Sequence, residues 1–77
     1  MIPTREVIEQ IRREFPAGTR MRLTFMDDPQ APPIGTEGTV LGVDDIGSLL
    51  MQWDNGSRLN LVYGEDCADV IDVEKSV

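Results

Sequence analysis

Histidine is absent from this chain of 77 residues, and cysteine occurs once. The chain therefore lacks the side chain that most often serves as a general base or a metal ligand. Cys67 cannot form an internal disulfide, and it has no second cysteine and no histidine for zinc binding or nucleophilic catalysis. We expect it to be a buried or half-buried structural thiol in a reducing cytoplasm. These absences predict a protein that is not an enzyme and needs no cofactor.

Long apolar runs are also missing. No stretch approaches the ~20 apolar residues that a membrane span requires. Charged residues from Arg5 onward interrupt any hydrophobic segment of the signal-peptide kind. We therefore expect no membrane partner. A chain of this length should form one domain, whose core is too small to enclose a deep cavity.

Basic residues are few, seven against fourteen acidic residues, and they are unevenly distributed. Residues 1–26 contain five basic and three acidic residues, for a net charge of +2, whereas residues 27–77 contain two basic and eleven acidic residues, for −9. Because an acidic surface repels phosphate, nucleic acid is not an expected partner. The acidity suits a protein with a basic surface, or it mimics DNA, or it only keeps the chain soluble.

Turn-forming residues divide the segment 35–64 into short apolar stretches. Asn55-Gly56 predicts a type I′ turn, in which both central residues have positive φ. Asp44-Asp45-Ile46-Gly47 fits a longer loop, a type I turn closed by a glycine in the left-handed region. Between the turns, apolar residues at every second position indicate a half-buried strand: Leu49, Met51 and Trp53.

Further strands are predicted on both sides of this meander. Residues 20–25 alternate, with Met21, Leu23 and Phe25 facing inward, and residues 68–73 supply a last strand after a short turn at 64–66. Gly42 indicates a bulge or tight bend in the strand before the first turn. Five short strands without crossover helices imply an antiparallel sheet. The predicted fold is mainly β, a small five-stranded antiparallel SH3-like barrel preceded by one N-terminal amphipathic α-helix.

The helix is predicted over residues 1–15, with residues 16–77 forming the barrel of the same single domain. Thr4 is suited to cap the helix, and Pro16 ends it. At about 100° per residue its apolar side chains share one arc: Val7, Ile8, Ile11 and Phe15. A helix this short needs a surface on which to dock. We expect that surface to be its own barrel, with a weak homodimer or another protein as the alternative.

Two features are candidate binding determinants. The loop at residues 26–34 contains three prolines, which lower the entropic cost of holding one shape, and a loop this long is often functional. Its alternative role is a stiff connector that caps the barrel. Trp53 and Tyr63 form the second feature, because tryptophan often anchors interfaces, although Trp53 also suits the core or its rim.

The paired acids at 27–28 and 44–45 are less suited to metal. Neither pair has the alternating oxygen ligands of a dedicated calcium loop, and the second pair is explained by turn formation, so no metal site is predicted. The residues predicted to bind a protein partner are Asp27, Asp28, Pro29, Pro32, Pro33, Asp44, Asp45, Trp53, Asp54 and Tyr63.

Several segments together form a recognisable pattern. They are Pro16-Ala17-Gly18-Thr19-Arg20-Met21-Arg22-Leu23, Met26-Asp27-Asp28-Pro29-Gln30-Ala31-Pro32-Pro33, Gly35-Thr36-Glu37-Gly38-Thr39-Val40, Val43-Asp44-Asp45-Ile46-Gly47 and Trp53-Asp54-Asn55-Gly56-Ser57. This series resembles a small bacterial and phage domain family of unknown function with the pattern PxGTRVxL, then MxDPxxPPxGTxGTVxxVDDxGxxxxxWDNGxxLxL. The resemblance covers roughly residues 16–64 and leaves the N-terminal helix outside. It implies a fold and an association with mobile elements, and no assigned activity.

The sequence thus favours a non-catalytic protein-interaction module of a bacterial or phage protein, since the same motifs are more distantly similar to SH3-like barrels that bind proteins. The proline-rich loop and the acidic turns are its predicted contacts. The alternative is a phage-type effector that inhibits or sequesters a host defence component, as an acidic DNA mimic or a small-molecule sponge. An enzyme is the least supported reading, because no acid–base group converges in the sequence.

Overall fold

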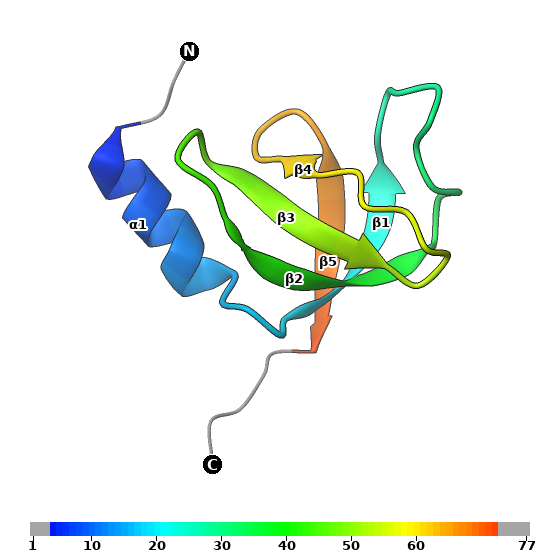
Figure 1. The fold of residues 1–77 in the computed structure, drawn as a ribbon, viewed down its shortest axis with the longest axis horizontal. Helices are drawn as coiled ribbons and strands as arrows, with labels where there is room; N and C mark the ends of the chain where they lie inside the picture. Colours follow the sequence, from blue (N-terminus) through cyan, green and yellow to red (C-terminus); the bar gives the residue numbers. More distant parts are fainter. Residues whose placement is uncertain (1–3, 73–77) are drawn as a thin grey trace.

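The computed structural model describes residues 4–72, which form one helix and five strands (Figure 1). The elements are α1 (Arg5–Glu14), β1 (Arg20–Phe25), β2 (Glu37–Val43), β3 (Ser48–Trp53), β4 (Leu61–Val62) and β5 (Cys67–Asp72). All strand pairs are antiparallel, and the strands are ordered β4-β3-β2-β1-β5 across one sheet. The prediction of a mainly β fold with an N-terminal helix is confirmed. Val73, which the sequence assigned to the last strand, lies outside the described residues.

The helix begins and ends at residues suited to both roles. The Thr4 hydroxyl accepts a hydrogen bond from the Val7 backbone N–H at 3.3 Å, which satisfies one of the free donors of the first turn. At the other end, the N–H of Phe15 donates to the Ile11 carbonyl at 2.9 Å, and Pro16 follows. The predicted cap is therefore confirmed.

The helix packs on the sheet of its own chain. Ile8 and Ile11 are buried, and Ile11, only 2% exposed, belongs to the main hydrophobic core. Phe15 packs at the edge of that core, whereas Val7 is 39% exposed, so the predicted apolar arc is too wide by one residue. Arg12 adds a polar contact, since its guanidinium donates to the carbonyl of Val43 at the end of β2.

The core is formed mainly by side chains of the strands, to which α1 adds Ile11. Its other buried residues are Met21, Leu23, Met26, Val40, Leu49, Met51, Trp53 and Leu61. The Trp53 side chain is 1% exposed, and its indole N–H donates to the carbonyl of Leu59 at 2.8 Å. A buried indole needs such a partner, because an unpaired N–H would cost free energy. Burial of this core is the main term that stabilises the fold.

Bulges decide which side chains face the core. In the β2–β3 pair the register shifts between Val40 and Gly42, as the glycine predicted. In the β1–β5 pair it shifts between Leu23 and Phe25, which leaves Thr24 without an opposite residue. An extra residue reverses the inward alternation, so Phe25 is 52% exposed and Met26 takes the buried position. The prediction that Phe25 faces inward is therefore wrong.

The turns at residues 44–47 and 53–56 have the same conformation, each closed by a glycine with positive φ. Gly47 has φ +85°, and its N–H donates to the Asp44 carbonyl, which confirms the predicted type I turn closed by glycine. Gly56 has φ +92°, and its N–H donates to the Trp53 carbonyl in the same way. No described non-glycine residue has positive φ, so Asn55 does not adopt the conformation that a type I′ turn requires. The type I′ prediction is wrong, because the loop extends by one residue and only its glycine is left-handed.

The sheet is not closed into a barrel. After the second turn the chain leaves β3 and returns only for the two residues of β4, so one edge of the sheet is very short. Within residues 4–72, the edge strands β4 and β5 form no hydrogen-bonded ladder with each other. An isolated bridge joins Tyr63, directly after β4, to Asp66, directly before β5. The structure therefore supports an open antiparallel sheet with a helix against it (Figure 1).

Candidate functional site

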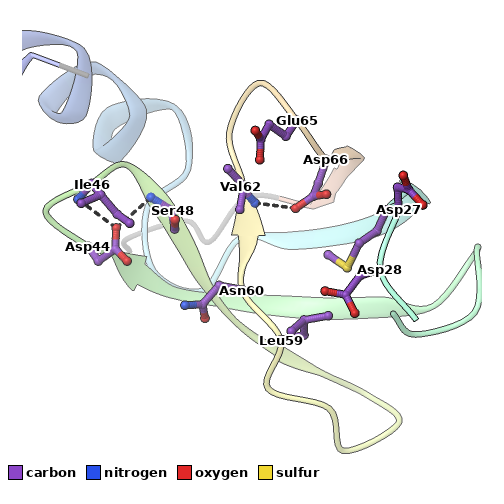
Figure 2. Close-up of a pocket in the computed structure, with 11 residues that line it drawn as sticks. Asp27, Asp28, Asp44, Ile46, Ser48, Leu59, Asn60, Val62, Glu65 and Asp66 are labelled. Carbon is purple, nitrogen blue, oxygen red and sulfur yellow. Dashed lines mark hydrogen bonds between the residues drawn. The ribbon is translucent and has the colours of Figure 1, made fainter. Parts of the chain in front are cut away.

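An open pocket of about 370 Å³ brings four separate segments together (Figure 2). It is lined by Met26, Asp27, Asp28, Asp44, Ile46, Ser48, Leu59, Asn60, Val62, Glu65 and Asp66. Five of these residues carry carboxylates, and none is a lysine or an arginine. We call it the acidic pocket. In Figure 2, Asp44 lies at one end and Asp27 and Asp28 at the other.

Met26 and the proline-rich loop position the first two acids. The buried side chain of Met26 anchors the chain directly after β1, which places Asp27 and Asp28 at the pocket wall. The Asp28 carboxylate accepts a hydrogen bond from the backbone N–H of Gln30 at 2.7 Å. The backbone carbonyl of Asp28 accepts one from the N–H of Ala31 at 3.0 Å. These bonds form a local turn of the kind that aspartate favours.

Asp44 is held by the turn between β2 and β3. One carboxylate oxygen of Asp44 accepts two backbone N–H groups, from Ile46 at 3.1 Å and from Ser48 at 2.8 Å. Figure 2 shows both bonds. Because that oxygen is already used, only the second oxygen of Asp44 is free for a ligand.

Glu65 and Asp66 close the pocket from the turn between β4 and β5. Asp66 accepts the backbone N–H of Val62 at 2.7 Å, whereas the carboxylates of Asp27 and Glu65 make no hydrogen bond within the described residues. None of the five pocket acids forms an ion pair with a basic residue of the described segment 4–72. The pocket is therefore a concentration of negative charge that no ion pair within residues 4–72 neutralises.

Apolar side chains complete the lining. Ile46 and Val62 are exposed there, and Met26 and Leu59 lie against the core. A pocket with carboxylates and aliphatic surface suits a side chain with a cationic head and an aliphatic stem, as in lysine and arginine. Within residues 4–72, no set of three or more acidic or cysteine side chains is arranged to hold a metal ion.

Three of the ten predicted binding residues meet in this pocket: Asp27, Asp28 and Asp44. Asp45 points elsewhere, with its carboxylate 3.6 Å from the Arg12 guanidinium. Among the prolines, Pro32 is buried, while Pro29 and Pro33 are exposed, and none lines the pocket. The proline-rich loop thus frames the pocket through its first residues and packs inward through its middle.

The predicted aromatic contacts do not form a joint surface. Trp53 belongs to the core, so the interpretation as an interface anchor is replaced by a structural role. Tyr63 is partly exposed and packs edge-to-face on Phe15, with ring centroids 6.1 Å apart. It lines a second hollow, of about 230 Å³, that also contains Cys67. Cys67 is exposed, which corrects the expectation of a buried or half-buried thiol.

Asp54 is engaged by an arginine. Arg20 on β1 donates two hydrogen bonds to the two Asp54 carboxylate oxygens, at 2.8 and 2.6 Å, and one to Thr39 at 2.9 Å. Glu37 lies 3.5 Å from the same guanidinium. The bonds from Arg20 lower the pKa of Asp54 below its ordinary value, and they raise the pKa of Arg20. Asp54 thus ties the turn after β3 to β1.

Glu65 and Asp66 are the pocket acids that the sequence did not indicate as a site. The sequence predicts only a short turn there, because no nearby residue relates these acids to Asp27 or Asp44. The pairing of β3 with β4 brings the 60s segment beside the Asp44 turn, since Ser48 lies opposite Val62. This grouping of acids depends on the pairing of the two strands and could not be predicted from the spacing of residues in the sequence.

A family described as a domain of unknown function, DUF4314, matches residues 4–71. The chain belongs to this family. The DUF4314 match includes α1, so the helix is part of the domain, and the expected limit of the resemblance at residue 16 is wrong. No curated protein and no solved structure matches the chain. Within residues 4–72 no helix has both the length and the apolar character of a membrane span.

Proposed function

We propose that this DUF4314 domain is a non-catalytic protein-interaction module that receives a lysine or arginine of a partner protein in the acidic pocket. One observation supports the proposal above all. Segments far apart in the chain bring five carboxylates to one pocket, and none of its described lining residues is a lysine or an arginine. In this proposal the acidic turns contact the partner, as the sequence predicts, whereas the prolines only hold the loop beside the pocket.

Electrostatics favour a cationic ligand. Carboxylates gathered in a concave surface raise the local negative potential, which attracts cations and speeds the encounter with a basic protein. Asp27 and Glu65 have no hydrogen-bond partner of their own in the described segment 4–72, so their oxygens are available to a guanidinium or an ammonium. The exposed aliphatic surface of Ile46 and Val62 would receive the stem of the same side chain.

We also propose that the open sheet is an SH3-like barrel whose last seam is unpaired. Two features support this assignment: β5 pairs with β1 at the far side of the meander, and only the four residues 63–66 connect β5 to β4 at the opposite edge of the sheet. Bulges at Thr24 and Leu41 add the bending that a small barrel needs. A bacterial or phage origin, a mobile-element setting and a cytoplasmic location stay predictions.

The alternative function, a phage-type effector, would also rely on carboxylates, but on those of a wide surface and not on those of the acidic pocket. An acidic DNA mimic would spread its negative charge over a wide face, and its binding would follow the net charge of the whole chain. A module with a binding pocket would depend on particular carboxylates. Variants that remove the same charge at different positions therefore separate the two.

Affinity capture with matched variants tests the proposal. Asp27→Asn with Glu65→Gln removes two pocket charges that support no hydrogen bond in the described fold, and Glu9→Gln with Glu14→Gln removes two charges from α1. We expect a protein retained from host extract by the parent chain to be lost with the pocket variant, kept by the helix control, and released by free arginine. Equal loss with both variants would favour the DNA mimic and contradict the pocket proposal.

A further inference from the structure

The strand β5 forms one edge of the sheet and leaves half of its backbone without a strand partner. It pairs with β1 on one side, and in the described segment 4–72 no strand pairs with its other side (Figure 1). Alternate residues of a strand direct their N–H and C=O groups to opposite neighbours, so β5 presents a row of free donors and acceptors. With six residues, β5 is long enough to pair with a further strand. Its register with β1 shifts between Val70 and Asp72, so Ile71 is bulged, and Asp69 and Asp72 lie opposite two alternate residues of β1, Arg22 and Arg20.

Side chains on β5 are also uncovered. Only Ala68 is half-buried, while Val70 and Ile71 are 42% and 38% exposed. Phe25, which the bulge turns outward, lies opposite Cys67 at the start of this strand. A strand added here would gain apolar contacts in addition to main-chain hydrogen bonds.

Charge indicates what kind of strand fits. Between Arg58 and Lys75 the chain contains no basic residue, and two of its acids, Asp69 and Asp72, lie on β5. In register they lie opposite Arg22 and Arg20 of β1. Both arginines instead form their ion pairs with acids on the other side, Glu37 and Asp54. The acids of β5 therefore have no ion pair within residues 4–72.

The same charges disfavour a second copy of this chain. Two β5 strands side by side would bring two Asp69 and two Asp72 carboxylates together with no cation between them, and like charges on paired strands are destabilising. An extended segment with lysine or arginine at alternate positions would instead be attracted to β5, because its cations would lie near the carboxylates of Asp69 and Asp72.

We propose that the free edge of β5 is a second protein-binding surface, which adds a basic, extended segment of a partner as a sixth strand. Backbone hydrogen bonds from Cys67–Asp72 supply affinity, and Asp69 and Asp72 select a positively charged strand. This surface is distinct from the acidic pocket, because none of its residues lines that pocket.

The test uses the full chain and a peptide of alternating lysine and valine with the length of β5. Its controls are a glutamate–valine peptide and a lysine–valine peptide methylated at every backbone nitrogen. In a nuclear magnetic resonance titration, we expect only the unmethylated basic peptide to shift the backbone amides of 68–72. Asp69→Asn with Asp72→Asn should weaken its affinity about three- to tenfold, the effect of removing two exposed charges.

Three outcomes would overturn the proposal: equal binding of the methylated peptide, equal binding of the acidic peptide, or shifts at Asp27 and Asp44 without shifts at 68–72. The last outcome would mean that the peptide occupies the acidic pocket and not the edge. A free arginine derivative, which cannot form a strand, reports on the pocket alone. Failure of the edge proposal and failure of the pocket proposal are therefore distinguishable.

Discussion

At the scale of single residues, the close approach of Gly38 to Trp53 constrains the packing of the core. A Cβ at Gly38 would lie 2.6 Å from Cε3 of the Trp53 ring and 3.1 Å from the Gln52 carbonyl oxygen. The ring is buried and its N–H is bonded to Leu59, so it cannot move aside freely. The strand pair β2–β3 thus approaches closely only because residue 38 has no side chain.

Gly38→Ala should therefore lower the free energy of unfolding by about 1–3 kcal/mol, the usual cost of overpacking a core. Gly42→Ala is the matched control, because nothing lies within 4 Å of a Cβ at that glycine. Its effect should stay within about 1 kcal/mol. Urea denaturation of both variants measures the difference. Equal stabilities would contradict the role assigned to the Gly38 contact.

The Arg20–Asp54 pair makes stability depend on pH. Because the pKa of Asp54 lies below its ordinary value of 3.8 in the folded chain, the unfolded state binds its proton first as the pH falls. The stabilising contribution is present above pH 3.8 and is lost as the pH falls through the lowered pKa. Asp54→Asn should flatten this acid limb of the stability profile, measured by denaturation at several pH values. Arg20→Gln should flatten it equally, and an unchanged slope in either variant would contradict the assignment.

At the scale of elements, α1 is held to the sheet mainly by Ile11. Ile11→Ala should lower the free energy of unfolding by about 2–5 kcal/mol, as expected for a large side chain removed from a core. Val7→Ala, at an exposed position of the same helix, should change it by no more than ~0.5 kcal/mol. Thermal melts and light scattering on both variants measure the effects. A normal melt for Ile11→Ala with loss of dimer mass would show that the helix docks on another chain.

Elements set by local chemistry could be predicted from the sequence. The cap at Thr4, the turn at Asp44–Gly47, the bulge near Gly42 and the bounds of β1 all follow from residues close together in the chain. The outward turn of Phe25 depends on the pairing of β1 with β5, over 40 residues later, and could not be read locally. The same holds for the two-residue length of β4, which leaves the sheet open.

At the scale of the whole molecule, acids offset three of the six arginines, and the net charge of the chain is −7. Arg12, Arg20 and Arg22 each pair with an acid, at 3.6, 2.6 and 3.3 Å in their shortest ion pairs. We therefore predict no binding to duplex DNA or RNA beyond the weak non-specific range at about 150 mM salt. A gel-shift assay measures it, and micromolar or tighter binding would contradict the prediction.

The acidic pocket was only partly predictable. The acids of residues 27–28 and 44 were candidates from their loops, but nothing in the sequence joined them to one another or to Glu65 and Asp66. That grouping arises when β3 pairs with both β2 and β4. Trp53 was a candidate that the structure removes from the surface. A tryptophan suits an interface as well as a core, and only the packing of the folded chain decides between the two.

Titration of the isotope-labelled full chain with N-acetylargininamide tests the pocket most directly. The neutral citrulline analogue serves as the control, because it has nearly the same shape without the charge. We predict weak binding, with Kd on the order of 1 mM, and amide shifts centred on Asp27, Asp44 and Glu65. The shifts should vanish with Asp27→Asn and Glu65→Gln. Equal shifts with the citrulline analogue, or shifts that avoid the pocket, would contradict the account.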